Sequence, residues 1–246
     1  MIQVALNGAR AQSENAAIPF TVEEMVGSTR AAAAAGAECV HFHVRAAGGA
    51  ESIQPEDVAT SLNAMRHAIP GFPLGISTAE WIVPDSAERH QLVSDWTVLP
   101  DFASVNFNEP GSVALAEMLL ARGVGIESGL GSVLAVENFV GSGLGNYCLR
   151  ALLEPEQQEM SAAAVVVGLI EAFLIRGGIK IPRLAHGYEN TAWDFIGLAA
   201  ARKYDTRIGF EDTVVMPDGA PAPGNAAIIA EAVRITRSLA KGASAT

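Results

Sequence analysis

The feature that most constrains the fold is a repeated alternation, along the whole chain, of short apolar β-favouring runs with longer helical patterns. The predicted strands span residues 2–7, 39–45, 73–77, 102–107, 124–127, 149–153, 183–187 and 206–210. The predicted helices span residues 21–37, 54–69, 85–96, 111–123, 134–140, 161–178, 190–204 and 223–240. Strands that alternate with helices form βαβ units, which assemble into a parallel sheet.

Eight such units in strict order favour a closed barrel over an open, doubly wound sheet. A dinucleotide-binding open sheet has a GxGxxG turn after its first strand, whereas residues 6–12 read LNGARAQ. The chain has 246 residues, close to the roughly 250 that a (β/α)8 barrel needs as one domain. We therefore predict an α/β fold, a single (β/α)8 TIM-barrel domain over residues 1–246 that ends in a short flexible tail (GASAT, 242–246).

Composition excludes several classes of protein. A net charge of −11 argues against a nucleic-acid-binding surface, which needs a basic stripe. The sequence has no apolar run of the roughly 18 residues expected of a membrane span. The first ten residues, MIQVALNGAR, lack the features of a signal peptide, so a cytoplasmic location is expected. The two cysteines, Cys39 and Cys148, are too few for a disulfide framework.

Polar side chains accompany the carboxyl end of every predicted strand, where barrel enzymes place their chemistry. In chain order these residues are Asn7, Arg10, His41, His43, Arg45, Ser77, Thr78, Glu80, Ser104, Asn106, Asn108, Glu109, Glu127, Glu154, His186, Arg207, Glu211 and Asp212. The strand interiors are otherwise apolar. This convergence on one rim predicts an active site there.

The segment His41-Phe42-His43-Val44-Arg45 is the sharpest part of this rim. Because side chains alternate across a strand, both imidazoles point to one face. Two histidines spaced in this way can bind one metal ion, and a catalytic zinc usually takes a third protein ligand.

The residues alone leave that third ligand open among four strand ends: Glu127, Glu154, His186 and Glu211. Two adjacent carboxylates such as Glu211-Asp212 are costly unless one of them binds a cation and the other is paired. His186 is equally compatible with a metal ligand, a proton carrier or an ordinary loop histidine.

Four motifs together resemble the β-keto acid cleavage enzyme family: HFHVR (41–45), STAE (77–80), SVNF (104–107) and RIGFEDT (207–213). The resemblance runs in order from ALNGAR (5–10) to the eighth strand. It implies a zinc-dependent (β/α)8 barrel with one zinc ion per chain. It also implies a reaction of a small β-keto acid with acetyl-CoA that yields acetoacetate and a new CoA thioester.

The resemblance also assigns roles to individual residues. The matching zinc ligands are His41, His43 and Glu211, Asp212 matches the general base, and Arg207 matches the arginine that assists the acyl-CoA step.

Further positions follow from the same match and from the rim. Ser77 and Glu127 match a serine near the substrate and a supporting acid, and are expected in the catalytic set. The residues expected to bind substrate are Arg10, Asn7, Ser104, Asn106 and Arg45.

The chain departs from the family pattern at two loops. The family has a glutamate that meets a substrate amino group where this chain has Arg10, which predicts a substrate with a neutral or anionic tail. The loop over residues 46–52 reads AAGGAES, where the family usually has an aspartate.

Alternative functions remain open. The alternatives are a metal-dependent aldolase or hydrolase on the same barrel, and a binding barrel without catalysis. The resemblance and the apolar helix over residues 161–178 predict a homo-oligomer.

Overall fold

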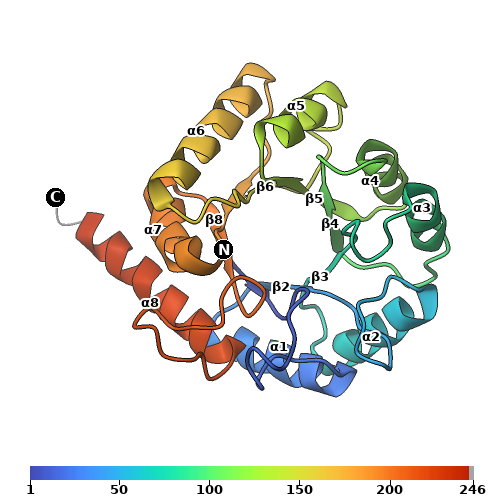
Figure 1. Cartoon of the computed structure of the whole chain (residues 1–246), viewed down its shortest axis with the longest axis horizontal. Helices are drawn as coiled ribbons and strands as arrows, with labels where there is room; N and C mark the ends of the chain where they lie inside the picture. The colour runs from blue at the N-terminus through green and yellow to red at the C-terminus, as the bar shows by residue number, and fades with distance from the viewer. Residues whose placement is uncertain (244–246) are drawn as a thin grey trace.

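The computed structural model describes residues 1–243 as a closed barrel of eight parallel strands inside a ring of helices (Figure 1). The strands are β1 (Ile2–Ala5), β2 (Cys39–Phe42), β3 (Leu74–Ser77), β4 (Phe102–Asn106), β5 (Gly125–Leu130), β6 (Arg150–Leu153), β7 (Arg183–Ala185) and β8 (Asp205–Ile208). Each strand pairs with the next one along the chain, and β8 pairs with β1. The predicted (β/α)8 TIM-barrel fold is confirmed.

A helix follows every strand, as the periodicity predicted. The helices are α1 (Val22–Ala35), α2 (Pro55–Ala68), α3 (Ser86–Ser94), α4 (Ser112–Ala121), α5 (Val133–Gly141), α6 (Met160–Arg176), α7 (Ala192–Arg202) and α8 (Asn225–Ala243), with a short 3-10 turn η1 (Glu189–Thr191) before α7. Thr21 and Glu24 cap the start of α1 with reciprocal hydrogen bonds, as their three-residue spacing predicts. Among residues 1–243, no helix is both long and apolar enough to cross a membrane.

Most element boundaries differ from the prediction by one or more residues, and β2, β5 and α8 are described here as examples. Strand β2 ends at Phe42, so His43 lies one residue beyond the ladder. Strand β5 continues past Glu127 to Leu130, because Ser128, Gly129 and Leu130 also pair with β4 or β6. Helix α8 extends to Ala243, into the predicted tail, whose residues 244–246 lie outside the described part of the chain. The prediction of a single domain is not tested by these features and stays a prediction.

The barrel has an apolar outer wall and a polar lumen. Outward residues such as Val4, Val40 and Ile126 are buried beneath the helices, as expected for a parallel sheet covered on that face. Gln3 on β1 donates a hydrogen bond of 2.7 Å to Glu127 on β5, so both side chains must cross the lumen. The parallel strands bring all eight carboxyl ends to one mouth, directly above this polar floor.

Candidate active site

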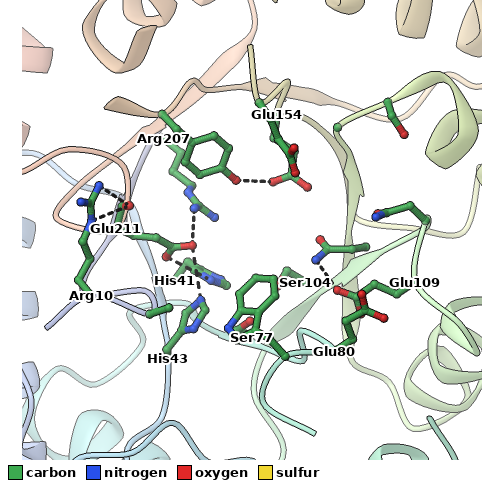
Figure 2. Close-up of a pocket in the computed structure, with 18 of the residues that line it drawn as sticks. Arg10, His41, His43, Ser77, Glu80, Ser104, Glu109, Glu154, Arg207 and Glu211 are labelled. Carbon is green, nitrogen blue, oxygen red and sulfur yellow. Dashed lines mark hydrogen bonds and ion pairs between the residues drawn. The ribbon is translucent and has the colours of Figure 1, made fainter. Parts of the chain in front are cut away.

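A cavity of about 850 Å³ opens at the carboxyl ends of the strands (Figure 2). Figure 2 shows Arg10, His41, His43 and Glu211 on one side, with Glu80 and Glu109 opposite. The residues that line the cavity are Ala9, Arg10, Glu14, His41, His43, Ser77, Glu80, Trp81, Ser104, Asn106, Asn108, Glu109, Gly131, Ser132, Glu154, Glu156, Gln157, Gln158, Tyr188, Arg207 and Glu211. The predicted convergence of polar groups at the barrel mouth is therefore present in the structure.

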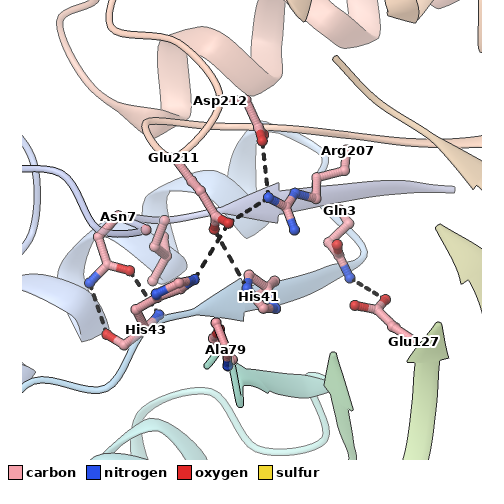
Figure 3. A network of polar contacts seen from close by, with 12 residues as sticks. Gln3, Asn7, His41, His43, Ala79, Glu127, Arg207, Glu211 and Asp212 are labelled. Atoms are coloured by element: carbon pink, nitrogen blue, oxygen red, sulfur yellow. Dashed lines mark hydrogen bonds and ion pairs between the residues drawn. The ribbon is translucent and has the colours of Figure 1, made fainter. Parts of the chain in front are cut away.

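His41, His43 and Glu211 form a compact cluster, each offering one ligand atom within 4.8 Å of the others. The Nε2 atoms of His41 and His43 lie 3.5 and 3.4 Å from the two carboxylate oxygens of Glu211 (Figure 3). Two imidazoles and one carboxylate make up the donor set of many catalytic zinc sites. These three residues could therefore hold a divalent metal ion.

The electrostatics of this cluster are those of a buried site. Burial lowers the pKa of His41 well below its ordinary value. Burial also opposes protonation of His43, but Glu211 and Glu51 outweigh it and raise the pKa of His43 to about 9. Burial would raise the pKa of Glu211, yet Arg207 and the two histidines hold it well below its ordinary value. The site therefore strongly favours a carboxylate at Glu211 and a cation beside it.

Arg207 on β8 joins Glu211 to Asp212. Its Nη2 atom donates to Glu211 Oε1 at 2.6 Å and to Asp212 Oδ1 at 3.0 Å. Burial disfavours the charged guanidinium, but Asp212 and Glu211 reverse this effect and raise the pKa of Arg207 well above its ordinary value. Asp212 is fully buried and, unlike Glu211, does not line the cavity.

A second series of polar side-chain contacts connects Asp212 to the cavity. His186 Nδ1 lies 3.4 Å from Asp212 Oδ1, and His186 Nε2 lies 3.2 Å from Glu154 Oε2. The Tyr188 hydroxyl donates to the same Glu154 oxygen at 3.2 Å. His186 is therefore buried between two carboxylates and does not belong to the metal-ligand cluster. Of the residues in this series of contacts, Glu154 and Tyr188 line the cavity.

The β3 and β4 strand ends contribute neutral polar groups to the cavity. Ser77 and Ser104 are paired neighbours across the two strands, and both line the cavity. Asn106 donates to Glu109 Oε1 at 2.7 Å. Burial raises the pKa of Glu109 above its ordinary value.

Besides Asp212, three residues of the predicted catalytic and substrate-binding set lie close to the site without lining the cavity. Asn7 bridges the backbone of His43, accepting from its N–H at 2.9 Å and donating to its carbonyl at 3.0 Å (Figure 3). Arg45 donates to the carbonyl groups of Gly8 and Arg10. Glu127 lies in the lumen below, paired with Arg150 at 3.1 Å. Asn7 and Arg45 therefore contact backbone groups of the rim, whereas Glu127 contacts Gln3 and Arg150 beneath it.

Arg10 lines the cavity, and its predicted influence on the substrate tail stays a prediction. Its guanidinium pairs with Glu14 at 2.9 Å and with Glu189 at 2.5 Å, and it also donates to the Glu211 carbonyl. Two carboxylates therefore already neutralise the charge that would attract an anionic tail.

Sequence reasoning missed two residues beside His43. Glu51 contacts His43 Nδ1, and Trp81 contacts Glu51 from the loop after β3. The available signal was the Gly48-Gly49 pair, which allows the chain to turn back so that Glu51 bridges Arg45 in antiparallel fashion. Tyr188 was also missed, because it lies three residues beyond β7.

Comparison with known proteins decides the family. The sequence model described as beta-keto acid cleavage enzyme matches residues 1–131 and 181–244, which include His41, His43 and Glu211. The chain belongs to the β-keto acid cleavage enzyme family. The family match leaves out residues 132–180, the segment that contains α5, β6 and α6.

Individual relatives in the family differ in how much of the chain they match. The 3-keto-5-aminohexanoate cleavage enzyme of Fusobacterium nucleatum is 26% identical over 263 aligned residues, covering 98% of this chain and 92% of that enzyme. The 3-oxoadipate:acetyl-CoA acetyltransferase of Cupriavidus necator is 40% identical, but over 79 residues that cover 32% of this chain and 28% of that enzyme.

Solved structures support the fold of this family member. A ternary complex of ObcA with a C4-CoA adduct and oxalate superposes with a TM-score of 0.73 at 16% identity. The similarity covers 92% of this chain but 64% of the ObcA chain, so this chain spans less than two thirds of that protein. At this identity the likeness establishes the shared barrel.

Proposed function

We propose that this chain cleaves a β-keto acid in a reaction with acetyl-CoA, using one zinc ion held by His41, His43 and Glu211. A β-keto acid R–CO–CH2–COO⁻ and acetyl-CoA would give R–CO–S–CoA and acetoacetate. The C2–C3 bond of the β-keto acid and the C–S bond of acetyl-CoA break. New bonds join C2 to the acetyl carbonyl carbon and C3 to the CoA sulfur. The observation that carries the proposal is the convergence of the three ligand atoms within 4.8 Å in a member of this family.

The residues around the cluster fit a divalent cation. Glu211 Oε2, which faces His41 Nε2, is buried and has no hydrogen-bond partner among the described residues. Both histidines present Nε2 to Glu211, so a cation between them would meet three ligands and keep a position open for substrate. When bound, zinc would supply a Lewis acid that stabilises negative charge on the substrate oxygens.

The other side chains support proton transfer and charge control. We assign the general base to Asp212, whose Oδ2 atom has no hydrogen-bond partner among residues 1–243. Because Asp212 does not line the cavity, it would act through His186 and Glu154, which connect it to the cavity wall. Arg207 donates to both Asp212 and Glu211 and lowers the pKa of Glu211. It could assist the acyl-CoA step from the cavity wall. The hydroxyl groups of Ser77 and Ser104 could orient the substrate carboxylate and stabilise an oxyanion.

The remaining predicted residues divide between contact and support. We assign substrate contacts to Arg10 and Asn106, which line the cavity. Asn7 and Arg45 hold the backbone of the β1 and β2 loops. Glu127 joins Gln3 and Arg150 through polar contacts in the lumen beneath the site.

The decisive experiment measures metal content by elemental analysis and then activity. We expect about one zinc ion per chain, lost or much weakened in His41→Ala and Glu211→Ala. We also expect acetoacetate to form from a β-keto acid with acetyl-CoA present. Cleavage that needs no acetyl-CoA would favour the aldolase or hydrolase alternative. Full metal affinity in both variants would refute the proposed site.

We also propose that the enzyme is a homo-oligomer. Val165, Leu169 and Ile175 on α6 expose 63%, 45% and 68% of their surface, and their spacing places Val165 and Leu169 on one face of the helix. Light scattering of wild type and Val165→Glu tests this proposal. A monomeric wild type would refute it.

A further inference from the structure

His43 is held differently from His41, because it lies outside the strand ladder. His41 is part of β2 and pairs in register with Ala5 on β1 and Gly75 on β3. The ladder ends at Phe42, so strand pairing does not fix the backbone of His43. Other contacts must therefore hold this ligand in place.

Three side chains supply these contacts. Asn7 binds both the backbone N–H and the carbonyl group of His43. Glu51 contacts the ring at Nδ1. The Trp81 indole is stacked on the imidazole, with ring centroids 6.1 Å apart and an interplanar angle of 19°. Every polar atom of His43 except Nε2 is thereby committed to a neighbour, and Nε2 faces Glu211 at 3.4 Å.

Glu51 is itself held in place. The Trp81 Nε1–H group lies 3.2 and 3.4 Å from its two carboxylate oxygens. The antiparallel bridge between Arg45 and Glu51 fixes the backbone, because the chain reverses at Ala46–Gly49. The side chain of Glu51 is only 14% exposed. This carboxylate therefore has little freedom to turn away from His43.

We propose that Glu51 and Trp81 are positioning residues for the metal ligand His43. The Glu51 carboxylate accepts the Nδ1–H of His43, which directs the Nε2 lone pair at the site of the cation, and Trp81 holds both groups at the cavity mouth. A carboxylate behind a metal-binding histidine fixes its ring orientation and raises its basicity as a ligand. The inference rests on the proposed metal site. It adds that the loop after β2 sets how tightly this site binds metal.

The test is the Zn²⁺ affinity of purified protein, measured by competition with a chromogenic chelator. We expect Glu51→Ala to weaken Zn²⁺ binding by about 10- to 100-fold. Glu51→Gln should lose less, because its amide oxygen can still accept from Nδ1. Trp81→Phe keeps an aromatic ring but loses the N–H group, so it should weaken binding less than Glu51→Ala. Glu56→Gln on the first turn of α2 removes the same charge nearby and should bind like wild type.

Two spectroscopic readouts separate positioning from general structural damage. Co²⁺ bound to Glu51→Ala should show a shifted visible absorption band, because the ligand geometry changes. Zn²⁺ should change the tryptophan emission of wild type, and Trp81→Phe should lose this change although Trp96 and Trp193 remain. Thermal unfolding of the metal-free variants checks that each one is folded.

The possible failures are distinguishable. If wild type binds Zn²⁺ and folded Glu51→Ala and Glu51→Gln bind it equally well, Glu51 does not position His43 and the inference is wrong. If wild type shows no saturable Zn²⁺ binding, the proposed metal site is wrong, and this inference, which depends on it, is wrong as well.

Discussion

Gly8 and Glu211 lie in direct contact at the barrel mouth, and no side chain fits between them. Gly8 has φ +52°, and a Cβ atom on it would lie 2.5 Å from Glu211 Cγ and 3.0 Å from Glu211 Cβ. A residue with a side chain would be strained in this left-handed conformation and would also clash. The glycine therefore allows the Glu211 carboxylate to lie beside His41 and His43.

Gly8→Ala should displace Glu211 and weaken Zn²⁺ binding by at least about tenfold, because a cation site depends on the exact placement of its ligands. The left-handed backbone should also cost about 1–3 kcal/mol of stability. Gly219→Ala is the matched control, since Gly219 has φ +84° but nothing within 4 Å of its Cβ position. Titration with Zn²⁺ compares the two variants. Equal affinities would contradict the steric explanation.

Removing Arg207 should destabilise the chelator-treated protein more than any surface change. Arg207→Met leaves the carboxylates of Asp212 and Glu211 without their shared cation, and an unpaired buried charge costs about 3–5 kcal/mol. Adding Asp212→Asn to this variant should recover part of the loss. Urea unfolding of the two single variants and the double variant measures this coupling. Strictly additive effects would mean that the two side chains do not interact energetically.

The substrate tail should carry a positive rather than a negative charge. The Arg10 charge is already neutralised by Glu14 and Glu189, and the cavity is also lined by Glu109 and Glu154. We expect 3-keto-5-aminohexanoate to exceed 3-oxoadipate in kcat/KM by about tenfold or more, or about 1.4 kcal/mol. Glu154→Gln should narrow this ratio. A preference for 3-oxoadipate would contradict this expectation and support the prediction, made from the sequence, that Arg10 favours a neutral or anionic tail.

The stability of the protein should fall at alkaline pH partly through Cys39. Burial raises the pKa of this thiol to about 12, from an ordinary value of 9.0. Between these values the unfolded chain loses a proton that the folded chain keeps, so stability falls as pH rises. At pH 10.5 this single group should cost about 2 kcal/mol relative to pH 8. Cys39→Ala should lose correspondingly less in urea unfolding at the two pH values, and an identical loss would contradict the prediction.

The barrel could be predicted from the sequence because the patterns that indicate strands and helices depend on neighbouring residues. A strand of alternating or apolar residues and a helix such as α1, with its Thr21–Glu24 cap, can be recognised from neighbouring positions. The HFHVR spacing is local as well, and it correctly placed His41 and His43 together at the rim. Local spacing could not select the third ligand, because the candidates lie far from His43 in the sequence; Glu211, for example, is 168 positions away. The family resemblance was needed to choose Glu211 from the four.

What the sequence could not supply were contacts made by chain reversal and by closure of the barrel. The prediction for Arg10 took no account of Glu189, which pairs with its guanidinium from the loop after β7. Asp212 read as a cavity residue, yet it is turned behind Arg207 and joined to His186.

The sequence by itself thus determined the eight βα units, the rim on which the polar groups gather and the two histidines of the cluster. Only the tertiary structure decided which charges are already paired and which residues reach the cavity. The physical reason is the separation along the sequence of the residues that interact. Helix and strand periodicities depend on residues a few positions apart, whereas pairs such as Gly8 and Glu211 become neighbours only when β8 closes against β1.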